Sequence, residues 1–373
     1  MPTKPSARAF QLKTTTSKAR TTAKKKVVPK RKNAVGLDLP LYTIDISNFK
    51  SINKISFKPA RVNVFIGEPN AGKSNILEAL ALTNVRSVME LPKLPSTMIR
   101  YSDMASLFFD KNYDKDIRIT VGEHTFILDH MRGKFFLRWF SEIKNEWELS
   151  LGFDKSGGII DRRIIPEPPV FKYHFRGIPG EDRGTAPTTA FRDNLDPDGW
   201  NLWKIIRHDS RLKEFAGDFF SKFSFKILFE KNSNRLDIMR ISDDHYYQID
   251  FSMTPDTFQR MLYYLAAIES NKNSVLLFEE PESQSYPPYI QMLADRIIDD
   301  KHNQYFITTH SPFVIEKMLE HASVENEVKI FITYYEDFQT KVRELTRKEI
   351  IFIMDNNVDL FFNMQAFQKE PKK

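Results

Sequence analysis

Cysteine is absent from this sequence of 373 residues, and so is any long apolar run. Without cysteine the chain has no disulfide, no thiolate zinc site and no cysteine nucleophile, which agrees with a reducing compartment. The longest apolar runs, such as residues 350–354, are far too short to span a bilayer. The first residues also lack the apolar core of a secretory signal. We therefore expect a cytoplasmic protein with no membrane partner.

Acidic residues are missing from residues 1–36, which hold 11 Lys and Arg and are otherwise rich in Thr, Ala, Ser and Pro. Too few apolar side chains are present there to offset the entropy of ordering, so we predict a disordered basic arm. The arm is either a solubilising tail or a non-specific, salt-sensitive contact for nucleic acid. The remaining residues carry 44 basic and 49 acidic side chains, so the body of the chain is mildly acidic.

Residues 37–373 predict one α/β domain with a large insertion. Alternation with period two predicts strands at 42–49 and 55–57, and the apolar run 62–67 predicts a buried strand before a helix at 74–85. The second half of the domain, 251–373, is predicted to contain helices at 256–270, 285–299 and 347–355 and strands at 274–282, 304–312, 329–335 and 341–346. This order predicts a mixed or parallel sheet.

The insertion, residues 86–250, is less regular and is predicted to hold short aromatic-rich strands and helices. Its stretch 156–199 is rich in Gly, Pro and Asp, which predicts a loop or lid. Helical spacing over residues 201–223 predicts one long helix, with further short strands up to residue 251. No internal repeat is present.

The clearest motif directly follows the strand at 62–67. Gly67, Gly72, Lys73 and Ser74 satisfy the pattern G-x-x-x-x-G-K-[ST] between a strand and a helix. Glycines let backbone N–H groups surround a phosphate, and the helix N-terminus adds its partial positive charge. We expect Lys73 to reach the β- and γ-phosphates of ATP and Ser74 to bind Mg²⁺. The predicted ATP contacts in this loop are Gly67, Glu68, Pro69, Asn70, Ala71, Gly72, Lys73, Ser74 and Asn75.

A nucleotide loop of this kind needs an acidic partner at the end of a neighbouring buried strand. The run VLLFEE at 275–280 supplies Glu279 and Glu280. We expect Glu279 to hold the Mg²⁺ shell and Glu280 to polarise the attacking water. His310 ends the next strand, about 30 residues further on, where a sensor of the γ-phosphate would sit. The predicted catalytic residues are therefore Lys73, Glu280 and His310.

These pieces in this order resemble the ABC-type ATPase heads of the SMC/RecF class, and more closely the AAA ATPases related to OLD proteins. The residues that carry the resemblance are ISNFKSI (46–52), GEPNAGKSN (67–75), LLFEEPE (276–282), ITTHSP (307–312) and NVDLFFN (357–363). The resemblance implies a P-loop NTPase fold with an ABC-ATPase-like head and a variable insertion. It also implies an ATP site shared between two copies of the chain.

In that class a Ser-x-Gly-like loop before the helix preceding the acidic strand completes the partner's ATP site. The equivalent stretch here is FSMTPDTFQRML (251–262), which offers Ser252 but no glycine. Arg260 is expected to compensate for Asp256, which would repel a phosphate at this helix N-terminus. The family's usual Asp-Glu pair is replaced by Glu279 and Glu280.

The resemblance implies an ATP-driven dimerisation switch in prokaryotic DNA maintenance or anti-phage defence. Proteins of the OLD class carry a C-terminal Toprim nuclease, whereas only 63 residues follow His310 and they contain no D-x-D. We therefore expect the ATPase part alone, as a homodimer or higher homo-oligomer, with any effector on a separate protein. Two alternatives stay open: a scaffold that binds nucleotide with negligible hydrolysis, and a nuclease whose metal site lies in the middle region.

Overall fold

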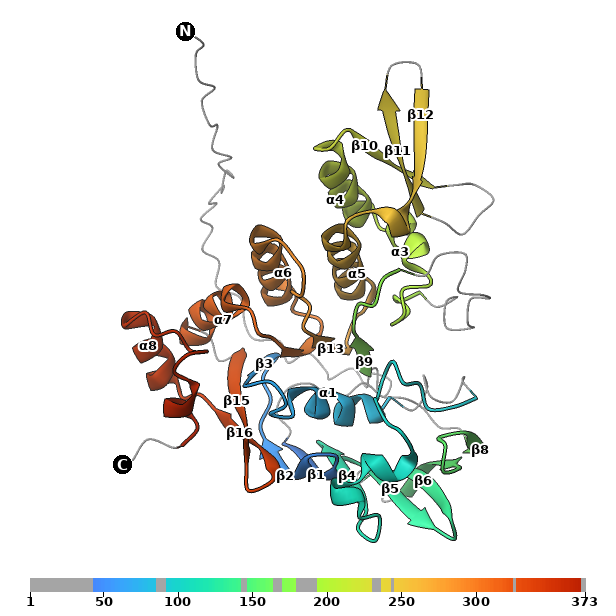
Figure 1. Ribbon diagram of the computed structural model, residues 1–373, viewed down its shortest axis with the longest axis vertical. Helices are drawn as coiled ribbons and strands as arrows, with labels where there is room; N and C mark the ends of the chain where they lie inside the picture. Colours follow the sequence, from blue (N-terminus) through green and yellow to red (C-terminus); the bar gives the residue numbers. More distant parts are fainter. Residues whose placement is uncertain are drawn as a thin grey trace, which may run out of the picture. The chain divides into compact units, whose positions relative to one another are not determined.

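The computed structural model describes residues 43–84, 92–141, 146–163, 170–178, 193–229, 236–242, 245–324 and 327–369. The predicted basic arm, residues 1–36, lies outside these residues. Within them the chain forms three sheets (Figure 1). The mixed α/β class predicted from the sequence is confirmed.

The central sheet has the strand order β16-β15-β3-β14-β13-β9. Its strands are β3 (Val62–Ile66), β9 (Val170–Tyr173), β13 (Val275–Glu279), β14 (Gln304–Thr308), β15 (Val328–Glu336) and β16 (Gln339–Glu344). All neighbours pair in parallel except β15 and β16, which form an antiparallel hairpin. The carboxyl ends of β3, β14, β13 and β9 therefore meet at one edge of the sheet.

A second, antiparallel sheet has the order β2-β1-β4-β5-β6-β7-β8. Its strands are β1 (Ile44–Phe49), β2 (Ile52–Phe57), β4 (Ile117–Val121), β5 (His124–Met131), β6 (Lys134–Ser141), β7 (Glu146–Phe153) and β8 (Ile159–Arg163). A third sheet consists of β10 (Phe225–Phe229), β11 (Leu236–Ser242) and β12 (His245–Asp250). Residues 86–250 thus supply most of the antiparallel sheet, all of the third sheet, and strand β9 of the central one.

Helix α1 (Lys73–Leu82) lies between the central and the antiparallel sheet (Figure 1). The opposite face of the central sheet is covered by α5 (Asp256–Ser270), α6 (Pro287–Asp299) and α7 (Pro312–Val324). The central strands are fully buried because successive side chains point to opposite faces of the sheet and both faces are covered. In β13, for example, Leu277 packs on the α1 side and Phe278 on the α5 side.

The structure differs from the predicted elements at two places. The predicted loop or lid at 156–199 contains β8 and β9, so that part of the prediction is wrong. The predicted single helix at 201–223 is two helices, α3 (Leu202–His208) and α4 (Ser210–Ser221). The break occurs because Asp209 leaves the helical conformation and its side chain accepts hydrogen bonds from the N–H groups of Arg211 and Leu212. The closing helix α8 (Arg347–Asp355) has the predicted bounds.

Candidate ATP site

The predicted phosphate loop runs from the buried end of β3 to the N-terminus of α1. Both glycines of the motif are required by their surroundings. A Cβ on Gly67 would lie 2.1 Å from the carbonyl oxygen of Thr333. Gly72 has φ +99°, and a Cβ there would lie 2.0 Å from Thr340 Oγ1. The loop is thus packed tightly against the β15–β16 hairpin, while Glu68, Pro69 and Asn70 are exposed.

A chain of hydrogen bonds fixes the outer side of this loop. The Thr340 hydroxyl donates to the carbonyl of the buried Ala71 at 3.0 Å, and its oxygen lies 2.6 Å from Ser51 Oγ. The Asn75 side chain donates to the same Ser51 hydroxyl at 2.7 Å. Asn75 therefore anchors α1 to the turn between β1 and β2, although the sequence predicts it as an ATP contact.

Lys73 begins α1 and points back over the loop. Its ammonium donates to the carbonyl oxygens of Gly67 at 2.9 Å and Glu68 at 3.0 Å. Burial lowers the pKa of Lys73 to about 8, although the Glu280 carboxylate opposes this shift. The loop thus holds a buried cation at the place where phosphate oxygens are expected.

Glu279 ends β13 directly beside the start of α1. Only 6% of its surface is exposed, and burial by itself would raise its pKa. The charge and hydrogen bond of Lys172, with a hydrogen bond from Ser74, instead hold the pKa at about 2. A hydroxyl and an ionised carboxylate are hard oxygen ligands, so this pair fits Mg²⁺. The described residues contain no group of three or more His, Asp or Glu side chains that could hold a metal ion.

Glu280 and His310 lie together at the ends of β13 and β14. His310 Nε2 is 3.5 Å from Glu280 Oε1, and both side chains are half-exposed. Glu280 has φ +44°, a conformation that is rare for residues other than glycine and that turns its side chain out of the strand. Burial and the charge of Lys73 lower the pKa of His310, whereas Glu280 raises it. A neutral imidazole can both donate and accept a hydrogen bond.

Glu282 connects the two strand ends and was not predicted to take part in the site. Its Oε1 accepts from the Thr309 hydroxyl at 2.6 Å and from the His310 backbone N–H at 2.9 Å. Only 7% of its surface is exposed, and burial raises its pKa. This carboxyl group therefore fixes the backbone from which His310 projects.

The sequence prediction also missed a buried ionic cluster around Glu279. Lys172 from β9 lies 2.8 Å from Glu279 Oε2, and His174 Nδ1 lies 3.6 Å from the same atom. Arg100 contacts Glu279 Oε1 at 3.4 Å and Glu78 Oε1 at 2.8 Å. A sequence signal for β9 existed in the run VFKYHF at 170–175, which is rich in strand-forming residues.

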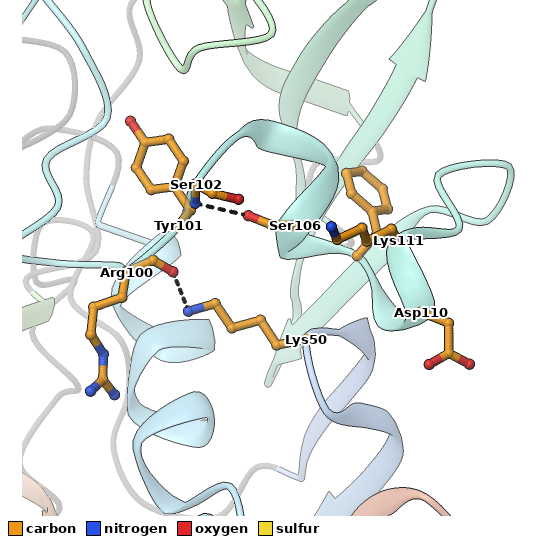
Figure 2. A pocket seen from close by; sticks show the side chains of 8 residues that line it. Lys50, Arg100, Tyr101, Ser102, Ser106, Asp110 and Lys111 are labelled. Atoms are coloured by element: carbon orange, nitrogen blue, oxygen red, sulfur yellow. Dashed lines mark hydrogen bonds between the residues drawn. The ribbon is translucent and has the colours of Figure 1, made fainter.

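Arg100 of this cluster and the neighbouring Lys50 also border the surface. Lys50 and Arg100 line a hollow of about 590 Å³ together with hydroxyl and aromatic side chains (Figure 2). The Lys50 ammonium donates to the Arg100 carbonyl and to Glu78 on α1. The cluster thus extends from this hollow to the predicted Mg²⁺ ligand Glu279.

Ser252 and Arg260 lie apart from this group. Ser252 is exposed in the short 3₁₀ helix η5 (Phe251–Met253), just before α5. Arg260 is buried, and its guanidinium lies 4.7 Å from the ring centroid of Phe175. Within the described residues, no hydrogen bond or ion pair joins either side chain to Lys73, Glu279, Glu280 or His310. Both stay predictions for a site completed by a second copy.

Two parts of the chain match models of known protein families. Residues 188–316 match a family model described as "AAA domain, putative AbiEii toxin, Type IV TA system". Residues 39–88 match a model described as "Protein of unknown function (DUF2813)". No curated protein matches the chain. The first match contains Glu279, Glu280 and His310, and the second contains the phosphate loop. The relationship to OLD proteins is not distinguished by these matches and stays a hypothesis.

The chain is also similar to solved structures of SMC heads. An SMC head bound to the C-terminal winged-helix domain of ScpA is 14% identical, with 83% of this chain and 99% of that chain covered and a TM-score of 0.46. The SMC head domain from Thermotoga maritima is 13% identical, with 83% and 100% covered and a TM-score of 0.39. A head with an extended coiled coil, bound to the C-terminal domain of ScpA and derived from Pyrococcus furiosus, is 12% identical, with 85% and 99% covered and a TM-score of 0.45.

None of the helices in the described part of the chain combines the length and the apolar character needed to cross a membrane. The chain thus has a mixed α/β fold with a phosphate-loop geometry between β3 and α1, and its residues 188–316 are similar to an AAA domain.

Proposed function

We propose that this chain binds Mg-ATP at the carboxyl edge of its central sheet and hydrolyses it. One observation carries the proposal: the ends of β3, β13 and β14 bring the phosphate loop, the Ser74–Glu279 pair and the Glu280–His310 pair to one place. These side chains come from segments more than 200 residues apart in the sequence. Each has the chemistry that phosphoryl transfer requires at that position.

Each residue has a defined task in this proposal. Backbone N–H groups of the phosphate loop, in which Pro69 has none, bind the phosphates together with the Lys73 ammonium. Ser74 and Glu279 hold Mg²⁺. When bound, Mg²⁺ would neutralise charge on the phosphate oxygens. Glu280 orients the attacking water and accepts its proton. His310, fixed through Glu282, donates a hydrogen bond to the γ-phosphate.

The test is nucleotide binding and turnover by the purified protein and by Lys73→Ala. Loss of the buried ammonium removes the charge that meets the β- and γ-phosphates. We expect ATP affinity to fall by on the order of tenfold or more and turnover to fall by on the order of 100-fold. If Lys73→Ala hydrolyses ATP as fast as the wild type, the proposed mechanism is wrong.

We further propose that ATP is shared between two copies of the chain, so that binding closes a dimer and hydrolysis opens it. The exposed Ser252 and the N-terminus of α5 support this, because no side chain caps that helix. Under this proposal an effector is a separate protein, residues 1–36 contact nucleic acid, and the setting is DNA maintenance or anti-phage defence.

The scaffold alternative, in which nucleotide is bound but hardly hydrolysed, also has support. Glu279 is already ion-paired with Lys172, and Arg260 is covered by Phe175. The oligomeric state of Glu280→Gln, measured by size-exclusion chromatography in the presence of ATP, distinguishes a hydrolase from a scaffold. A hydrolase should accumulate ATP-bound dimers when Glu280 is replaced, whereas the dimer fraction of a scaffold should equal that of the wild type.

The nuclease alternative predicts that the protein cleaves plasmid DNA in the presence of Mn²⁺.

A further inference from the structure

We propose that Lys172 is a built-in counter-cation that weakens the hold of Glu279 on the metal ion and so makes metal binding depend on the nucleotide. The inference rests on the proposed function, because it concerns the metal of the Mg-ATP site. It adds a positioning residue that neither the motif nor the family matches contain.

Strand pairing places Lys172 on the side of the sheet that faces α1. In the parallel pair β9–β13, Lys172 is the partner of Leu277. Leu277 belongs to the apolar cluster that packs around α1, and so does Val170, two residues before Lys172. Since side chains alternate along a strand, Lys172 points to the same side as Val170. That side carries Glu78 of α1 and the end of β13.

The Lys172 ammonium is buried, with 1% of its side-chain surface exposed. It lies 2.8 Å from Glu279 Oε2, 3.1 Å from the carbonyl oxygen of Met98 and 3.8 Å from Glu78 Oε1. Lysine is almost never buried unless it is paired, and here two oxygens lie at hydrogen-bond distance from the ammonium and a third within ion-pair distance. The ammonium is therefore held in place by packing and by its contacts.

Glu279 is the carboxylate that depends most on Lys172. Glu78 has two further partners, Lys50 and Arg100 Nε. The Arg100 guanidinium is a second cation at Glu279, at the longer distance of 3.4 Å, and 59% of the Arg100 side chain is exposed on the rim of the hollow in Figure 2. His174 Nδ1 lies 3.6 Å from Glu279 Oε2, but burial lowers the pKa of His174, which favours its neutral form. Arg100 can turn into water, whereas Lys172 cannot.

A metal ion bound between Ser74 and Glu279 would meet a carboxylate whose negative charge is already partly neutralised, because Lys172 lies 2.8 Å from Glu279 Oε2. A fixed positive charge this close also repels a divalent cation, and burial strengthens both effects because the effective dielectric is low. Ser74 and Glu279 alone then hold the ion weakly. Phosphate oxygens supply the missing negative charge, so the ion binds tightly only with the nucleotide.

The experiment is a Mn²⁺ titration of the full-length protein with the fluorescent analogue mant-ATP, read by the fluorescence of the bound analogue. We expect Lys172→Met to lower the half-saturating Mn²⁺ concentration by on the order of fivefold, because the repulsion is removed. Lys172→Arg keeps the charge and should behave like the wild type. Lys226→Met, at an exposed position of β10, is the matched control and should also leave the titration unchanged.

An unchanged or raised half-saturating concentration in Lys172→Met overturns the inference, even if the variant has a lower melting temperature. If Lys172→Met does not fold, Glu279→Gln and the double variant Glu279→Gln/Lys172→Met replace it. The double variant should need less Mn²⁺ than Glu279→Gln, and equal requirements contradict the inference. Absence of mant-ATP binding by the wild type overturns the proposed function itself, whereas the other outcomes leave that function standing.

Discussion

At the scale of single residues, the site depends on charged groups that are buried and compensated. Lys73 donates hydrogen bonds to backbone carbonyls, and Glu279 is ion-paired with Lys172 and accepts a hydrogen bond from Ser74. Removing one partner of such a pair costs more stability than replacing both, because it leaves a buried charge. Under the proposed function these contacts are in place before nucleotide binds, and its phosphates would replace the carbonyls at Lys73.

The pKa of Lys73 predicts how ATP binding depends on pH. In the free protein this pKa is lowered to about 8, so Lys73 loses its proton as the pH rises through that value. Phosphates favour the charged form, so binding should take up protons and weaken between pH 7 and 9. Calorimetry in buffers of different ionisation enthalpy measures the uptake. Lys73→Arg, which stays charged, should show none. Equal uptake in both proteins would rule out Lys73 as the source.

At the scale of elements, the β15–β16 hairpin acts as a clamp on the phosphate loop. Its backbone at Thr333 abuts Gly67, and its Thr340 hydroxyl binds the Ala71 carbonyl. The hairpin belongs to the same sheet as β3, the strand that leads into the loop. The structure thus links the loop to an element that lies about 270 residues further along the chain.

Thr340→Val tests the clamp, since it removes the hydroxyl with little change in shape. Loss of the bond to Ala71 should cost about 0.5–1.5 kcal/mol of stability and weaken ATP binding by roughly threefold to tenfold. Thermal unfolding and mant-ATP titration measure the two effects. Thr120→Val is the control, because the Thr120 hydroxyl lies 3.1 Å from the Thr125 hydroxyl on the neighbouring strand of the antiparallel sheet. If both variants bind ATP as the wild type does, the hairpin does not shape the loop.

Some parts of the candidate site can be predicted from the sequence, and others cannot, depending on the element that carries them. The phosphate loop, Glu279 and His310 follow buried strands directly, so short-range patterns predicted them. Strand β9 was missed because its partner β13 lies about 100 residues away and its surroundings are rich in Pro and Gly. Glu78 was missed for another reason: within α1 it resembles a solvent-exposed helix residue, and only Lys50 and Arg100 reveal its burial.

At the scale of the whole molecule, the site is assembled from two distant parts of one chain. Residues 39–88 supply the phosphate loop, and residues 188–316 supply the acids and the histidine. Between them the chain supplies strands β4 to β8 of the antiparallel sheet and returns as β9, which carries Lys172 to the candidate site. The insertion therefore also contributes a strand and a charged residue to the candidate ATP site.

The measurement that tests the central claim most directly is phosphate release from Mg-ATP by the wild type and by Glu280→Gln, with bound ATP determined in the same samples. The proposed mechanism predicts steady release by the wild type. It predicts that Glu280→Gln binds ATP but releases phosphate slower by on the order of 100-fold, because the water loses its base. Equal rates in the two proteins, or no release by the wild type while ATP stays bound, would contradict hydrolysis at this site.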